Sequence, residues 1–192
     1  MSFKKNTRII GQHALLSPSN YHWLDYDEDK LRRWYFQRQQ SIRGDKLHAY
    51  AQQAIDLGQR QPDNGTTVAM YINDAIGHRM SPEVPLYYSD DCFGTADSLG
   101  FREERWHGAL INTLRVSDLK TGISSADMKQ LKIYAGLFCF EYNFNPFDLH
   151  VILRIYQNDA IEELIPDPSD IFMVMQQIKT QAQRIAYLRE ED

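Results

Sequence analysis

The sequence is poor in cysteine, and it has no long apolar run and no low-complexity tract. Its two cysteines, Cys92 and Cys139, are too few for a disulfide framework or for a four-cysteine zinc or iron–sulfur site within one chain. No segment approaches the roughly 20 apolar residues of a membrane-spanning helix, so we expect no membrane partner. No GxxxxGK[ST] loop occurs, so ATP is not implied. The polar start does not resemble a signal peptide, which predicts a cytoplasmic location.

The composition is that of a folded protein of ordinary size. Its 192 residues suit one domain over 1–192, and 43% apolar residues can build a core. The net charge of −5 disfavours a protein that coats nucleic acid, but an enzyme can grip nucleic acid locally. Six basic residues against three acids lie in 28–48, whereas 143–170 holds six acids and one arginine. The basic segment could therefore face phosphates.

Hydrophobic periodicity places helices and strands in a mixed order. Helical spacing covers 28–40, 43–57, about 67–77, 126–142 and 168–189, and Ser17-Pro18 is typical of a helix start. Alternation predicts strands at 83–88, 92–99, 109–120, 147–156 and 160–164. This order predicts an α/β fold in which a central mixed β-sheet is flanked by helices.

The strongest chemical pattern lies at the predicted strand ends. Asp97 comes late in the strand 92–99, while Asp118 and Lys120 end the strand 109–120 and share one face of it. If the strands are neighbours, two carboxylates meet, which costs free energy unless a cation lies between them. Magnesium or manganese prefers such ligands, and a lysine beside a metal-bound water suits phosphodiester hydrolysis. An exposed strand end with an incidental ion pair is the alternative for an isolated Asp-x-Lys.

Four segments in this order resemble the PD-(D/E)XK nuclease superfamily, in particular its RecB-like branch. They are Gly44-Asp45-Lys46-Leu47-His48, Gly94-Thr95-Ala96-Asp97, Asp118-Leu119-Lys120-Thr121-Gly122 and Gln130-x-x-x-Tyr134-Ala135. The resemblance covers about 17–156 and implies a restriction-endonuclease-like core, with a closing helix at about 168–189. The branch includes the nuclease domain of RecB and exonucleases of phages and CRISPR systems.

The resemblance also implies roles for individual residues. His48, Asp97, Asp118 and the backbone carbonyl of Leu119 would bind the metal, and Lys120 would be the catalytic lysine. Glu83 resembles an additional acid that some members carry before the first strand. Without the other segments, His48 would be read as a surface or packed histidine.

The helical pair Gln130 and Tyr134 would point toward the active site, where it contacts DNA or orients Lys120. Alternatively, Tyr134 packs in the core and Gln130 is solvated. Gly94 would admit the DNA backbone near Asp97 or only mark a bulge. Candidate phosphate contacts are the arginines Arg32, Arg33, Arg38 and Arg43, for which a solvated helix face is the default. Candidate stacking residues, which core packing explains equally well, are Tyr21, Trp23, Trp34 and Tyr35.

The sequence thus predicts a Mg²⁺- or Mn²⁺-dependent DNA exonuclease without an iron–sulfur cluster. Its substrate would be single-stranded DNA or duplex ends, in phage- or CRISPR-linked recombination, repair or DNA processing within the host-cell cytoplasm. Some relatives form rings around DNA, which leaves a homo-oligomer open, and unwinding or annealing would need a recombination partner. The alternatives are an endonuclease on the same core, or a non-catalytic nucleic-acid-binding or inhibitor protein.

Overall fold

The structure, a computed structural model, describes residues 14–122 and 127–191. By internal contacts the chain divides into two units, with the boundary between Ser41 and Ile42. The first unit contains a short 3-10 helix, η2 (Pro18–Asp25), and the beginning of helix α1 (Glu28–Asp56). Pro18 stands in the first turn of η2, as the sequence predicts, because proline lacks the N–H that a helix start leaves unpaired.

Helix α1 is continuous, which corrects the prediction of two helices at 28–40 and 43–57. It runs for 29 residues, from Glu28 to Asp56. No proline interrupts this segment, and Gly44 is the only glycine in it. One glycine costs a helix only about 1 kcal/mol, which packing can offset. Gly44 is buried, so packing around it can offset this cost and the helix continues through it.

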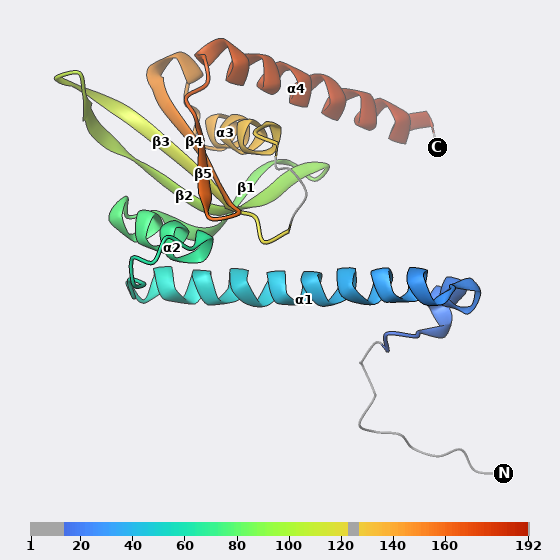
Figure 1. The fold of residues 1–192 in the computed structure, drawn as a ribbon. Helices are drawn as coiled ribbons and strands as arrows, with labels where there is room; N and C mark the ends of the chain where they lie inside the picture. Colours follow the sequence, from blue (N-terminus) through green and yellow to red (C-terminus); the bar gives the residue numbers. More distant parts are fainter. Residues whose placement is uncertain (1–13, 123–126, 192) are drawn as a thin grey trace, which may run out of the picture. The chain divides into compact units, whose positions relative to one another are not determined.

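The second unit is built on a five-stranded mixed sheet (Figure 1). Its strands follow the chain order: β1 (Ser81–Ser89), β2 (Cys92–Trp106), β3 (Ala109–Leu119), β4 (Leu149–Gln157) and β5 (Ala160–Leu164). The β3–β4 pair is parallel and the other pairs are antiparallel. The predicted α/β fold with a mixed sheet flanked by helices is therefore confirmed.

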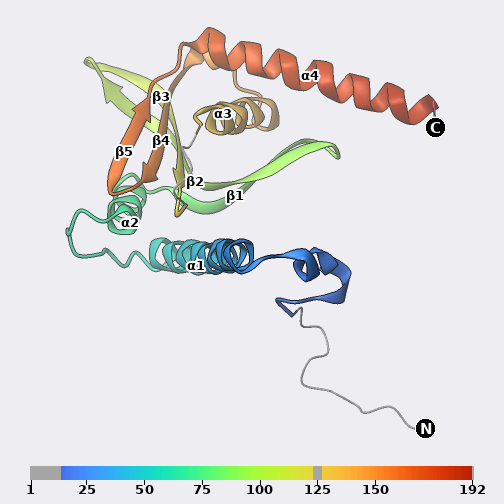
Figure 2. The ribbon, with the colours of Figure 1, turned by 45° about the vertical axis from the view of Figure 1, so that its right-hand side comes forward.

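Helices cover both faces of this sheet (Figures 1 and 2). Helix α3 (Lys129–Glu141) packs on one face, and α4 (Pro168–Glu191) packs on α3; Leu131, Ala135, Ile171 and Ile178 join this core. Helix α2 (Thr67–Gly77) packs on the other face with the end of α1, in a cluster that includes Leu119. The short helix η3 (Pro146–Asp148) leads into β4.

The strand lengths differ from the prediction at one important place. The predicted strand 92–99 continues to Trp106, because the polar residues after Leu99 still pair with β3, from Gly100 with Arg115 to Trp106 with Ala109. Asp97 consequently lies inside β2 rather than near its end. The predicted strand 147–156 begins at Leu149, after η3. Of the predicted helix 126–142, residue 126 lies outside the described residues.

Helices long and apolar enough to cross a membrane are not found among the described residues.

Truncating Ile171, a buried side chain through which α4 packs on the core, should destabilise the second unit. Ile171 is fully buried in the core formed with α3 and the sheet. We expect Ile171→Ala to lower the free energy of unfolding by about 2–5 kcal/mol, because the cavity cannot be refilled. The adjacent Phe172 is 43% exposed, so Phe172→Ala should cost less than about 1 kcal/mol. Urea denaturation compares the two variants, and equal losses would contradict this seating of α4.

Candidate metal centre

The candidate site lies where β2 and β3 part. Their pairing begins at Ser98 with Ser117, so Asp97 precedes the ladder and Asp118 follows it. Beyond this point the backbone N–H of Leu119 donates to Oδ2 of Asp97 at 2.8 Å. The next N–H, of Lys120, donates to the carbonyl of Tyr156 in β4 at 2.9 Å. The predicted proximity of Asp97 to the end of β3 is thus present.

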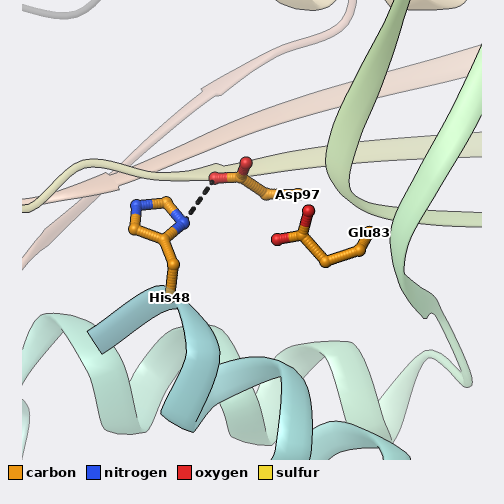
Figure 3. Close-up of side chains that lie close together, drawn as sticks. All are labelled: His48, Glu83 and Asp97. Atoms are coloured by element: carbon orange, nitrogen blue, oxygen red, sulfur yellow. Dashed lines mark ion pairs between the residues drawn. The ribbon is translucent and has the colours of Figure 1, made fainter. Parts of the chain in front are cut away.

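Three potential metal ligands meet at this point (Figure 3). One ligand atom from each of His48, Glu83 and Asp97 lies within 4.8 Å of the other two. Nδ1 of His48, on α1, is 3.5 Å from Oδ2 of Asp97. Glu83 reaches the same point from β1. The fold therefore brings together His48 of α1, Glu83 of β1 and Asp97 of β2, although the first two are 35 positions apart in the sequence.

Glu83 has an unusual backbone conformation for a strand residue. Its φ is +49°, in the left-handed region, and the β1–β2 register passes from Pro82–Ser98 to Val84–Ala96 without pairing Glu83. A residue other than glycine pays roughly 1–2 kcal/mol for this conformation. Such strain is typical of functional sites. Here it accompanies a carboxylate beside His48 and Asp97, which favours Glu83 as a member of the site.

Asp118 is held by Lys120 rather than grouped with these three residues. Nζ of Lys120 lies 3.1 Å from Oδ1 of Asp118 and 2.9 Å from its Oδ2. The carboxylate is almost fully buried, and its Oδ2 has the charge of Lys120 nearby but no aligned hydrogen bond among the described residues. The predicted common face of Asp118 and Lys120 is present, and the role of Asp118 and of the Leu119 carbonyl as metal ligands stays a prediction.

Lys120 also contacts the helical pair from α3. Its Nζ donates to Oε1 of Gln130 at 3.2 Å, and Nε2 of Gln130 donates to the hydroxyl of Tyr134 at 3.2 Å. The ring of Tyr134 is half-buried against the core. Both sequence interpretations therefore hold in part: Tyr134 packs, and Gln130 orients toward Lys120. The contacts with DNA stay a prediction.

Crowded negative charge is the main electrostatic property of the site. Burial raises the pKa of Asp97 to about 6, and the charges of Asp118 and Glu83 add to this effect. The Leu119 N–H and His48 oppose it. A bound cation would lower this pKa, because it favours the charged form of the carboxylate.

Tyr71 is a neighbour of the site that the sequence did not reveal. It lies on the inner side of α2 and is 2% exposed. Burial raises the pKa of its hydroxyl well above the ordinary range, and the charges of Asp97, Glu83 and Asp118 raise it further. The sequence predicts Val68, Ile72, Ala75 and Ile76 on the apolar face of this helix. Tyr71 directly precedes Ile72, and this position is the one feature of the sequence that could have placed it near the same face.

The arginines and tyrosines predicted to contact DNA from segment 21–43 are exposed but lie in different parts of the chain. Arg32, Arg33 and Arg38 belong to the first unit, and Arg43 belongs to the second. Tyr21 and Tyr35 are 59% and 43% exposed. The candidates Trp23 and Trp34 are half-buried; Trp23 donates to the carbonyl of Ser17, and Trp34 packs edge-on to Tyr26. All of these DNA-binding roles stay predictions.

The donor set fits a hard divalent cation. Two carboxylates and one imidazole are within reach of one point, and a third carboxylate, that of Asp118, lies close by. The carboxylate oxygens suit Mg²⁺ and Mn²⁺, and His48 adds an imidazole, a ligand typical of divalent transition metals. The charges of Asp118 and Glu83 contribute to the raised pKa of Asp97, so a cation at this point would relieve their repulsion.

Gly44 allows the helix that carries His48 to approach the sheet. A Cβ at Gly44 would lie 2.6 Å from Oγ1 of Thr121, directly after Lys120. We expect Gly44→Ala to displace the helix turn before His48 and to weaken Mn²⁺ binding about tenfold. Adding Thr121→Ala should restore binding because it removes the obstructing hydroxyl. Calorimetric titration measures both variants, and a double variant as weak as Gly44→Ala would contradict this explanation.

The raised pKa of Asp97 predicts how the stability of the metal-free protein depends on pH. The folded state holds this proton more tightly than the unfolded state, whose carboxyl has the ordinary pKa of 3.8. The stabilising contribution is therefore complete below about pH 4 and is lost as the pH rises through about 6. Relative to Asp97→Asn, the wild type should lose on the order of 2 kcal/mol between pH 4 and 7.

Urea denaturation of both proteins at several pH values, in chelator, tests this dependence. Asp127→Asn is the matched control, because Asp127 is an exposed carboxylate whose pKa is lowered by the N–H of Lys129. A stability difference between wild type and Asp97→Asn that stays constant with pH would show that burial and repulsion do not act on Asp97 as described.

Comparison with known proteins identified no relative of this chain. No protein-family model, no curated protein and no solved structure matches the chain. The functional interpretation therefore depends on the residues that the fold brings together.

Proposed function

We propose that the protein is a divalent-metal-dependent deoxyribonuclease, and specifically an exonuclease. The observation that supports this proposal most directly is the convergence of His48, Glu83 and Asp97 within 4.8 Å, beside the ion pair of Asp118 and Lys120. One group of side chains can hold a cation, and the adjacent lysine can act on a phosphate or a water. Their order in the chain is the order of the RecB-like pattern.

In this proposal His48, Glu83 and Asp97 hold the Mg²⁺ or Mn²⁺ ion, with Asp118 and the Leu119 carbonyl as further ligands. A bound divalent ion of this kind lowers the pKa of water and stabilises negative charge on a phosphate. The N–H of Leu119 fixes the Asp97 carboxylate, since it donates to the oxygen nearest His48. The Asp97 ligand is therefore oriented before a metal binds, which favours tight binding.

Lys120 supplies the second positive charge of the site. Its ammonium is held between Asp118 and Gln130 and remains 33% exposed at its side chain, so it is both oriented and accessible. From this position it can orient the attacking water or stabilise charge that develops on the phosphate. The contacts with Asp118 and Gln130 use two of the three ammonium protons, which leaves one for substrate.

A non-catalytic nucleic-acid-binding protein is the competing function. Such a protein needs positive charge toward phosphates, and buried carboxylates work against it. Here Asp118 is buried at 4% side-chain exposure, and Asp97 at 20%. Their repulsion lowers stability unless a cation is bound. This cost favours an enzyme over a binding module.

The class of substrate follows from the resemblance to the RecB-like branch. That branch suggests linear DNA, as a single strand or a duplex end, processed in recombination or repair. A cytoplasmic location, with phage- or CRISPR-linked processing in the host cell, belongs to the same proposal. An endonuclease on this core would use the same residues and differ in accepting closed circular DNA.

Digestion of end-labelled linear DNA in Mg²⁺ and in Mn²⁺ tests the proposal. We expect Lys120→Ala and Asp97→Asn to lower the cleavage rate at least about 100-fold, since each removes a group that acts on the reacting atoms or the metal. Lys129→Ala is the matched control, because Lys129 is 86% exposed and pairs with Asp127 only at 3.5 Å. It should cleave as the wild type does.

The same assay separates the alternatives. Comparison of 5′ and 3′ labels gives the polarity of digestion, and an exonuclease leaves closed circular DNA intact. Cleavage of circular DNA would replace the exonuclease by an endonuclease. Undiminished hydrolysis by Lys120→Ala, or full turnover in excess chelator, would remove the proposed mechanism. Binding of DNA without cleavage under any metal would favour the non-catalytic protein.

A further inference from the structure

Gly94 lies directly beneath the ring of Tyr134. A Cβ at Gly94 would stand 3.1 Å from Cε1 of Tyr134 and 3.7 Å from its hydroxyl oxygen. The first of these distances, between two carbon atoms, is shorter than the optimal 3.5–4.0 Å. The ring of Tyr134 therefore rests against the backbone of β2 at a point where any side chain would push it away.

Tyr134 cannot retreat from such a side chain without cost. Its ring is also packed against the core that α3 forms with the sheet. Its neighbour in α3, Ala135, is fully buried in that core, so the helix backbone is fixed as well. A displaced ring would have to turn about its own side-chain bonds, and that movement carries the hydroxyl with it.

The hydroxyl of Tyr134 is the first member of a chain of contacts that ends at Lys120. It accepts from Nε2 of Gln130 at 3.2 Å, and Oε1 of the same amide accepts from Nζ of Lys120 at 3.2 Å. Both contacts are long for hydrogen bonds of this kind, so a displacement of a few tenths of an ångström is enough to break them. Because one amide makes both contacts, turning the amide alters both.

We propose that Gly94 is a positioning residue for Lys120, acting through Tyr134 and Gln130; its role in cleavage rests on the proposed nuclease function. The absent side chain at position 94 sets where the Tyr134 hydroxyl lies. The hydroxyl in turn sets the orientation of the Gln130 amide, with its oxygen toward Lys120. Gly94 thereby holds the ammonium in place without touching substrate or metal.

This role separates the position of the lysine from the binding of the metal. Gly94 pairs with Leu86 of β1 and precedes Asp97 by three residues in β2. The contacts of Asp97 go to Leu119 and His48, and those of Gly94 go to Tyr134. A side chain at position 94 should therefore alter the catalytic rate and leave the affinity for Mn²⁺ unchanged.

The effect on stability combines two opposing contributions. Glycine inside a strand is less favourable than alanine, and this gain offsets the cost of displacing the Tyr134 ring. Gly94→Ala should consequently change the melting temperature little while it impairs the site. A loss of activity without a loss of stability distinguishes displacement of the lysine from damage to the fold.

The experiment is a double-mutant cycle between Gly94→Ala and Tyr134→Phe, with two readouts. The first is kcat on linear DNA, which we expect Gly94→Ala to lower about tenfold, with the affinity for Mn²⁺ unchanged. The second is the ¹⁵N resonance of Lys120 Nζ in the metal-free protein, which should move toward its position in Gln130→Ala. In the Tyr134→Phe background, Gly94→Ala should change neither readout further.

Gly100→Ala is the matched control, because Gly100 lies in the same strand against the flexible side chain of Met80. It should leave the Lys120 resonance where it is. An unchanged resonance in Gly94→Ala, or an effect of equal size with and without the Tyr134 hydroxyl, would overturn the proposal. If the wild type cleaves no DNA, only the proposed nuclease function is contradicted. The resonance of Lys120 still tests whether Gly94 positions this lysine.

Discussion

Repulsion between carboxylates at the point where β2 and β3 part is the constraint on which the site depends. Asp97, Asp118 and Glu83 are close enough for the charges of the last two to raise the pKa of the first. Two buried like charges destabilise a fold unless positive charge compensates them. The chain supplies part of it, as Lys120 beside Asp118 and the N–H of Leu119 on Asp97. Burial first, and then the charges of Asp118 and Glu83, raise the pKa of Asp97 to about 6 in spite of this compensation.

The fold creates this crowding through simple strand geometry. Leu119 is buried in the cluster on the α2 face, so its neighbours Asp118 and Lys120 must point to the other side. There Lys120 meets Gln130 of α3. Parallel pairing with β4 continues to Leu119 with Tyr156, and it holds the end of β3 in place after β2 has left it. Because buried Leu119 lies between them in the strand, the alternation of side chains places Asp118 and Lys120 together on the opposite face.

These features differ in how far the sequence predicts them. The common face of Asp118 and Lys120 follows from the period of two, and the approach of Asp97 follows from adjacent strands joined by a short connection. His48 was identified only by resemblance, because no local pattern brings a residue in a helix to a strand 49 positions later. Glu83 was likewise identified only by resemblance, and its φ of +49° could not be predicted because no neighbour in the sequence dictates it. The length of β2 was missed because most residues after Leu99 are polar. Backbone pairing with β3 and the packing of Phe101 on Phe138 and Phe144 stabilise this continuation.

The contacts of Lys120 are separate from the group of side chains that would hold a cation. The lysine is committed to Asp118 and to the amide of Gln130, whereas the donor atoms of His48, Glu83 and Asp97 face one another. Because Lys120 already neutralises Asp118, most of the uncompensated negative charge lies at Asp97 and Glu83. A divalent ion would therefore gain the most at that position, beside an ammonium that Asp118 and Gln130 already orient.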